Sequence, residues 1–128
     1  MFQIDHLDHV ALNVKNLARA VQWYQEVLGL ERRYEEAWGE VPTMLCAGNT
    51  CVALFPTKTQ EPKPTPGDDT IAMRHLAFRV NHKNFEQARI ELRQRGIAFE
   101  FEDHDIAHSI YFSDPDGHRL EITTYELQ

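Results

Sequence analysis

Two segments of the sequence match each other position by position. The segment 7–14, Leu-Asp-His-Val-Ala-Leu-Asn-Val, can be laid over the segment 73–80, Met-Arg-His-Leu-Ala-Phe-Arg-Val. Each starts with an apolar and a charged residue, continues with His, an apolar residue and Ala, and ends in Val. Alternation of apolar and polar residues at period two is typical of β-strands. The repeat therefore predicts a chain built from two copies of one structural module.

A helix is expected after each of these strands. In the first copy, apolar residues at helical spacing follow Asn16, cover residues 17–28 and end at Gly29. Asn is a favoured N-cap, and Gly is favoured where a helix ends in the left-handed conformation. The second copy follows the same plan in a shorter form, between Asn84 and Gly96.

Three short strands are expected after each helix, because brief apolar runs alternate with turn residues. The expected strands are residues 30–36, 43–46 and 51–55 in the first half and 97–102, 108–112 and 118–124 in the second. The fold class is therefore α+β, with two tandem βαβββ modules at about residues 5–56 and 71–126 of a single domain, 1–128. A proline-rich polar linker, residues 57–70, is expected between the modules.

Charge and hydropathy exclude several partners. The 128 residues include 13 Lys and Arg against 20 Asp and Glu, for a net charge of −7. Nucleic acids and anionic membrane surfaces both require a basic face, so neither is an expected partner. The sequence has no apolar run of bilayer length and no secretory signal at the start, and a cytoplasmic location is expected.

The two cysteines, Cys46 and Cys51, lie in one apolar stretch. No disulfide is expected for a chain without an export signal. Both are interpreted as small core residues.

Strand parity selects three metal-ligand candidates. Side chains two apart share a strand face, so equivalent packing of the two halves brings His9 and His75 to equivalent positions. Glu121, on the last strand, then approaches the same centre. Two imidazoles and one carboxylate leave metal positions open for water or substrate, as Lewis-acid or oxygen-activating chemistry requires. One alternative to a metal site is that the two histidines are ordinary core or surface residues and that Glu121 faces solvent. Another is a metal ion with a purely structural role.

Four stretches resemble the vicinal oxygen chelate superfamily, which includes glyoxalases, bleomycin resistance proteins and extradiol dioxygenases. They are the opening strand from Leu7, the helix and return strand 20–30 with Trp23-Tyr24 and Leu28-Gly29-Leu30, the strand from His75, and the closing hairpin 109–122. The resemblance spans nearly the whole chain. It implies a cupped mixed sheet around one divalent metal ion held by His9, His75 and Glu121, and a tendency to form homodimers.

Departures from the family pattern narrow the expected chemistry. Metal-dependent glyoxalase I has a Glu ligand in the last strand of its first half, where this chain has Ala53, so glyoxalase I itself is not expected. Bleomycin-binding relatives lack the ligands that this chain keeps. Fosfomycin resistance proteins and extradiol dioxygenases carry a Tyr ten residues before the Glu, as Tyr111 stands before Glu121. Against the first branch, no Arg or Lys follows Glu121. Against the second, the linker offers no extra base His.

The closing hairpin supplies the remaining candidates. Tyr111 is expected to act in catalysis beside Glu121 by donating to a developing oxyanion, or else to fill the core. Ser109 and Ser113 alternate with Tyr111 on one strand and are expected to bind substrate. Arg119 shares the face of Glu121 and is expected to pair with an anionic substrate or to stand exposed.

The predicted function is a divalent-metal enzyme acting on a small substrate with vicinal oxygens. Lyase, isomerase, dioxygenase and thiol-addition reactions all fit this description. The alternative is a resistance protein that sequesters a small molecule without turnover. Iron, manganese, nickel, cobalt and zinc all suit the ligand set. The sequence leaves open whether the halves pair within one chain or between two.

Overall fold

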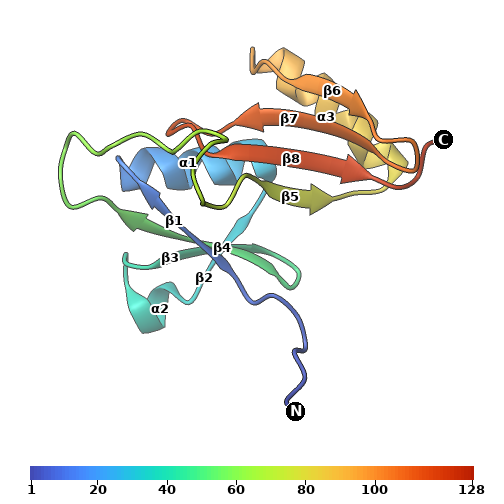
Figure 1. Ribbon diagram of the computed structural model, residues 1–128. Helices are drawn as coiled ribbons and strands as arrows, with labels where there is room; N and C mark the ends of the chain where they lie inside the picture. Colours follow the sequence, from blue (N-terminus) through green and yellow to red (C-terminus); the bar gives the residue numbers. More distant parts are fainter. The chain divides into compact units, whose positions relative to one another are not determined.

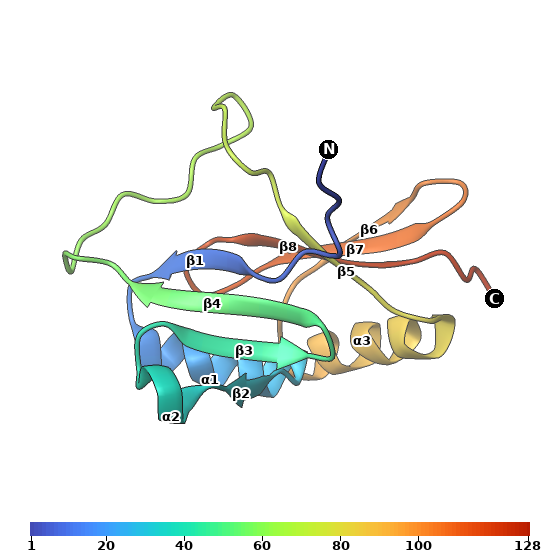
Figure 2. The same ribbon diagram turned by 90° about the horizontal axis from the view of Figure 1, so that it is seen from below.

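The computed structural model describes all residues, 1–128, and divides into two compact units, Met1–Lys63 and Pro64–Gln128. Each unit contains one four-stranded mixed sheet with a long helix packed on one face (Figure 1 and Figure 2). The elements of the first unit are β1 (Val10–Val14), α1 (Leu17–Leu28), β2 (Glu31–Arg33), α2 (Glu35–Trp38), β3 (Thr43–Ala47) and β4 (Thr50–Pro56). Those of the second are β5 (Leu76–Arg79), α3 (His82–Gln94), β6 (Glu100–Asp103), β7 (His108–Ser113) and β8 (Arg119–Thr124). No helix is both long and apolar enough to cross a membrane.

The two sheets have the same topology. The strand order is β1-β4-β3-β2 in the first unit and β5-β8-β7-β6 in the second. In each, the first strand pairs in parallel with the last, and the other pairs are antiparallel. The predicted βαβββ repeat and the α+β fold class are confirmed.

Each sheet buries the face that packs on its helix. In the first unit the buried residues of this layer include Leu12, Val14, Leu45, Val52 and Leu54 with Ala20 and Tyr24 from α1. In the second they include Ile110, Phe112, Leu120 and Ile122 with Phe85 and Leu92 from α3. Because successive side chains alternate across a strand, the residues between these ones lie on the opposite face, which we call the open face of each sheet.

The helix ends follow from local hydrogen bonds. Asn16 caps α1 as predicted, since its side chain accepts from the Arg19 amide at 3.0 Å, and Gly29 ends the helix with φ of 66°. The second helix begins earlier than the sequence pattern indicated. Asn81 is its N-cap and accepts from the amide of Asn84 at 2.8 Å, so Asn84 lies inside the first turn.

The strand expected at residues 30–36 is wrong in its second half. Strand β2 ends at Arg33, and Tyr34 takes a left-handed conformation with φ of 63° before the short helix α2. Arg32 stabilises this turn through an ion pair with Glu35 at 2.7 Å and a hydrogen bond to the Gly39 carbonyl at 3.2 Å. The extended backbone therefore ends at the left-handed Tyr34.

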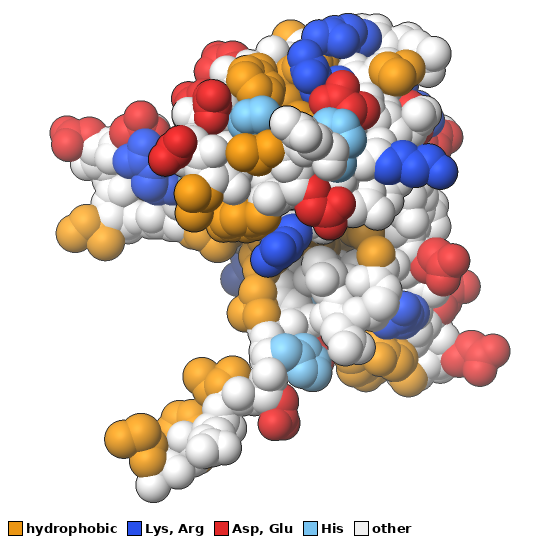
Figure 3. Space-filling view, turned by 90° about the vertical axis from the view of Figure 1, so that its right-hand side faces the viewer, with side chains coloured by type: hydrophobic (Ala, Val, Ile, Leu, Met, Phe, Trp, Pro, Cys, Tyr) orange, Lys and Arg blue, Asp and Glu red, His pale blue; other side chains and the backbone are white.

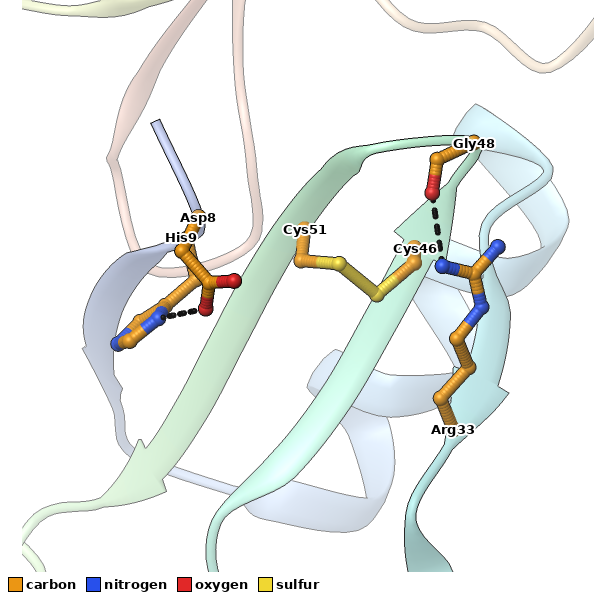
Figure 4. The surroundings of a disulfide bond; sticks show 6 residues. All are labelled: Asp8, His9, Arg33, Cys46, Gly48 and Cys51. Carbon is orange, nitrogen blue, oxygen red and sulfur yellow. Dashed lines mark hydrogen bonds and ion pairs between the residues drawn. A yellow bond between two sulfur atoms is a disulfide. The ribbon is translucent and has the colours of Figure 1, made fainter. Parts of the chain in front are cut away.

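The expectation of no disulfide is also wrong. Cys46 and Cys51 form a disulfide across the β3–β4 hairpin (Figure 4). The ladder pairs the two residues directly, so both side chains project from the same face of adjacent strands. The sequence placed both in one apolar stretch but left their register unknown. Cys46 is fully buried, in agreement with its interpretation as a core residue.

Candidate functional site

The open face of the second sheet carries the polar residues of the closing hairpin. Register places Tyr111 opposite Glu121, Ser109 opposite Thr123, and Ser113 opposite Arg119. Glu121 also lies beside Ala77 of β5, two residues after His75. Residues paired across strands project from the same face. One surface therefore gathers candidate side chains from β5, β7 and β8.

Glu121 is the centre of this group. Its Oε1 lies 2.8 Å from Nε2 of His75, and its Oε2 accepts a hydrogen bond of 2.6 Å from the Ser109 hydroxyl. The carboxylate is buried, and a buried carboxylate requires such partners. The two contacts fix its orientation, so that one oxygen faces His75 and the other faces into β7.

Ser109 holds the carboxylate rather than facing outward. It is fully buried, and its Oγ lies 3.0 Å from Oγ1 of Thr123 as well as 2.6 Å from Glu121. A hydroxyl with both contacts has little remaining hydrogen-bonding capacity. The contacts of Ser109 are those of a residue that orients Glu121, whereas the sequence suggested contact with substrate.

Tyr111 lies among charged and aromatic neighbours. Its ring meets His75 edge-on, with 5.5 Å between the centroids, and its hydroxyl is 3.0 Å from Nε2 of His104. Burial raises the pKa of Tyr111 above its ordinary 10.0, and the nearby carboxylates of Glu121 and Glu102 raise it further. The hydroxyl therefore keeps its proton at neutral pH and can act as a hydrogen-bond donor.

Arg119 and Ser113 lie at one end of this surface. The Arg119 guanidinium stands 5.2 Å from the centroid of the Tyr111 ring and 3.4 Å from Oε2 of Glu100. About 42% of its side chain is exposed, so its fork of donors remains accessible. Ser113 is exposed opposite Arg119, at the end of β7.

His9 lies in the other unit, immediately before β1. Its Nδ1 is 2.8 Å from Oδ2 of Asp8 (Figure 4). A carboxylate on Nδ1 fixes the ring and leaves the Nε2 lone pair available to a ligand. His75 and Glu121 thus stand together in one unit, while His9 and its partner Asp8 stand in the other.

The donor chemistry of these residues fits a divalent metal ion. No three His, Cys, Asp or Glu side chains gather into one cluster that could hold a metal. The pair His75 and Glu121, however, presents an imidazole nitrogen and a carboxylate oxygen side by side, a mixed donor set that suits iron, manganese, nickel, cobalt and zinc. His9, in the first unit, is a further imidazole donor, and Asp8 holds its Nδ1.

Sequence reasoning missed two residues of this arrangement. His104 is not among the predicted site residues, yet its Nε2 lies 3.0 Å from the hydroxyl of Tyr111, and both residues belong to the β6–β7 hairpin. Asp8 precedes His9 and was taken only as the charged residue of the repeat. The position of Asp8 next to His9 in the sequence was a signal that could have identified it. The contact of His104 with Tyr111 depends on the register of the hairpin, which the sequence does not show.

Comparison with known proteins identifies the family. The model of the glyoxalase/bleomycin resistance protein/dioxygenase superfamily matches residues 6–122. This chain belongs to that superfamily. Membership confirms the resemblance inferred from the strand and hairpin motifs.

Two relatives in the superfamily are similar over nearly the whole chain. A metallothiol transferase, FosB, of Staphylococcus epidermidis is 31% identical over 98% of this chain and 87% of its own length. A glutathione transferase, FosA, of Serratia marcescens is 30% identical over 93% of this chain and 80% of its own. A catechol-2,3-dioxygenase of Bacillus subtilis is 25% identical, and the match covers only 40% of that protein.

Solved structures of the superfamily share the fold. A glyoxalase/dioxygenase from Nostoc punctiforme gives a TM-score of 0.78 at 24% identity, over 94% of this chain and 90% of the other. The fosfomycin resistance protein FosX from Mesorhizobium loti gives 0.69 at 20% identity, over 98% and 96%.

Proposed function

We propose that the protein is a divalent-metal-dependent transferase that adds a small thiol to an electrophilic carbon of a small, oxygen-bearing substrate. Among the reactions open to the superfamily, thiol addition is favoured by the two transferases that match over most of their own length. The dioxygenase match covers less than half of that protein. The observation that carries the proposal is the cluster of His75, Glu121 and protonated Tyr111 on one sheet face.

In this proposal His9, His75 and Glu121 hold the metal ion. When bound, a divalent ion supplies Lewis-acid polarisation of substrate oxygens. Asp8 orients His9, and Ser109 orients Glu121, through the hydrogen bonds described above. Such outer contacts fix the direction of the ligand atoms and raise affinity for the metal.

Tyr111 stabilises the oxygen that leaves the attacked carbon. As the thiolate sulfur bonds to carbon, the carbon–oxygen bond breaks and negative charge develops on the oxygen. A protonated phenol placed beside Glu121 donates a hydrogen bond to that charge. A proton from solvent then completes the hydroxyl group of the product.

Arg119 binds an anionic group of the substrate. Its guanidinium lies over Tyr111 and stays partly exposed, so it can pair with a phosphonate or carboxylate next to the reacting carbon. This assignment supplies a cation on the same face of β8 as Glu121. Ser113, opposite Arg119, contributes a hydroxyl to the same end of the site.

The predicted homodimer and cytoplasmic location also belong to this proposal. Support for a dimer comes from the N-terminal segment, residues 1–7, in which Phe2, Ile4 and Leu7 are exposed. Hydrophobic side chains are also visible at the surface in Figure 3. Exposed apolar side chains in a row are typical of surfaces that a partner covers. A monomeric mass in light scattering at high concentration would contradict the dimer.

The activity is tested with purified protein stripped of metal and then loaded with each candidate divalent ion. Fosfomycin is offered with glutathione or cysteine, and adduct formation is followed by mass spectrometry. We expect the adduct to form only when metal, fosfomycin and thiol are all present. Catechol, and methylglyoxal with glutathione, serve as substrates of the rival reactions.

The other outcomes separate the alternatives. Ring opening of catechol without thiol addition would assign the protein to the dioxygenases. Tight binding of fosfomycin without turnover would support a sequestering protein. Absence of bound metal under replete conditions would defeat the metal site itself.

A further inference from the structure

The open face of the first sheet carries a second chemically reactive group, the disulfide between Cys46 and Cys51. It lies in a small apolar cluster with Met44 and Ala53, both buried, and with the partly buried Phe55. The proposed transfer reaction leaves this group without a role. The disulfide belongs to the first unit, whereas Glu121 and Tyr111 belong to the second.

The two sulfurs differ in accessibility. Cys46 is fully buried, whereas Cys51 is only partly buried, at the start of β4. Attack on a disulfide requires approach of a thiolate to one sulfur along the S–S axis, while the other sulfur leaves. The partly exposed Cys51 is therefore the sulfur that an incoming thiol can reach, and Cys46 is the leaving group.

Charged residues of β2 share the open face with the disulfide. Arg33 pairs with Met44, and Glu31 pairs with Cys46, so both side chains share the open face. The Arg33 guanidinium donates to the Gly48 carbonyl at 2.7 Å, which holds it at the Cys46 end of the hairpin (Figure 4). A fixed cation stabilises a nearby thiolate, whereas the carboxylate of the exposed Glu31 opposes it.

The disulfide adds little to chain stability. Only five positions separate its cysteines, and the β3–β4 ladder already brings them together. Stabilisation by a cross-link grows with the length of chain that it closes, so a short ring within an intact hairpin gains least. A purely structural role therefore explains this bond poorly.

We infer that Cys46–Cys51 is a thiol–disulfide exchange site that takes a low-molecular-weight thiol at Cys51. The thiolate of the small molecule bonds to Sγ of Cys51, the bond between the two cysteines breaks, and Cys46 leaves as a thiolate beside Arg33. A second molecule of the small thiol then attacks the mixed disulfide. It releases the oxidised small-molecule dimer and leaves two protein thiols, so two electrons pass from two small thiols to the disulfide.

The test uses the full-length oxidised protein and reduced glutathione, without metal or epoxide. Samples are quenched with N-ethylmaleimide in denaturant, and fragmentation of the peptide that holds both cysteines locates each adduct. We expect glutathione on Cys51 and the maleimide on Cys46. Arg33→Gln should slow the appearance of free thiols about threefold, as expected for a less stabilised leaving thiolate. Glu31→Gln is the matched control and should exchange at least as fast as the wild type.

Single-cysteine variants provide a second measurement that does not depend on capturing the intermediate. With oxidised glutathione, Cys46→Ser should accumulate the mixed disulfide at Cys51 about tenfold faster than Cys51→Ser does at Cys46, because Cys46 is buried. The proposal is overturned if the wild-type disulfide resists glutathione, if adducts form mainly on Cys46, or if Arg33→Gln exchanges as fast as the wild type. The double variant Cys46→Ser/Cys51→Ser, assayed with fosfomycin, separates this exchange from the proposed transfer.

Discussion

The two sheets differ most at one equivalent position. Ala53 on β4 lies between Ala11 and Met44, and Glu121 on β8 lies between Ala77 and Tyr111. The same ladder position therefore carries a buried methyl group in one unit and a buried carboxylate in the other. One topology thus carries a buried apolar cluster on the open face of one sheet and a polar site on that of the other.

The residues that surround the two positions differ in the same way as the positions themselves. Around Ala53 the neighbours are Met44 and the disulfide, which require no polar partners. Around Glu121 the neighbours are Ser109, His75 and Tyr111, each of which contacts it or shares its face. A buried carboxylate is tolerated only with such partners. In the proposed site the second unit therefore contributes His75, Glu121 and Tyr111, and the first contributes His9.

The largest effect is expected from Glu121→Gln, which makes the second sheet resemble the first. Loss of the charged ligand should lower kcat/KM for the proposed transfer about a thousandfold, equivalent to about 4 kcal/mol. Metal content by elemental analysis and initial rates measure the change. The exposed Glu61→Gln is the control and should retain wild-type activity. A variant with Gln at position 121 that kept full metal content and rate would remove Glu121 from the site.

The converse change, Ala53→Glu, brings a carboxylate into the apolar cluster of the first sheet. We expect it to destabilise the protein by about 3 kcal/mol, because the apolar cluster of Met44, Phe55 and the disulfide offers a carboxylate no hydrogen-bond donor. Urea unfolding in the presence of a chelator measures the free energy of unfolding. Glu at the exposed position 47 of the same hairpin, Ala47→Glu, should cost less than about 0.5 kcal/mol. Equal stability of the two variants would show that the open faces do not differ as described.

The fold was predictable from the sequence to a greater extent than the contacts of the site. The repeat of 7–14 at 73–80 and the caps at Asn16 and Gly29 depend on residues that are close in sequence. The structure contains the strands and the helix ends that they predict. The disulfide and the contact of His104 with Tyr111 depend instead on which residues of two strands face each other. Register is fixed by turn geometry and packing, so a one-residue shift would have separated both pairs.

A smaller effect is expected from Asp8→Asn, which tests the proposed metal-binding role of His9 in the first unit. The hydrogen bond to Nδ1 of His9 would weaken, and metal affinity should fall about tenfold to a hundredfold. Competition with a metal-binding dye measures this affinity. Asp5→Asn, at an exposed position of the same segment, should leave it unchanged. Equal affinities in both variants would mean that Asp8 does not orient His9 for a metal.

The smallest effect is a shift in the titration of Tyr111. Burial and the carboxylates of Glu121 and Glu102 raise its pKa above 10.0, and the folded protein therefore holds this proton more tightly than the unfolded chain does. The contribution of Tyr111 to the free energy of unfolding should be constant below pH 10 and should fall as pH rises from there through the folded-state pKa. Phenolate absorbance of the metal-free wild type, minus that of Tyr111→Phe, isolates the single group among four tyrosines. In Glu121→Gln the midpoint should move down, since the second-largest cause of the shift has been removed. A wild-type midpoint at or below 10.0 would show that Tyr111 lacks the buried, anionic surroundings that distinguish the second sheet from the first.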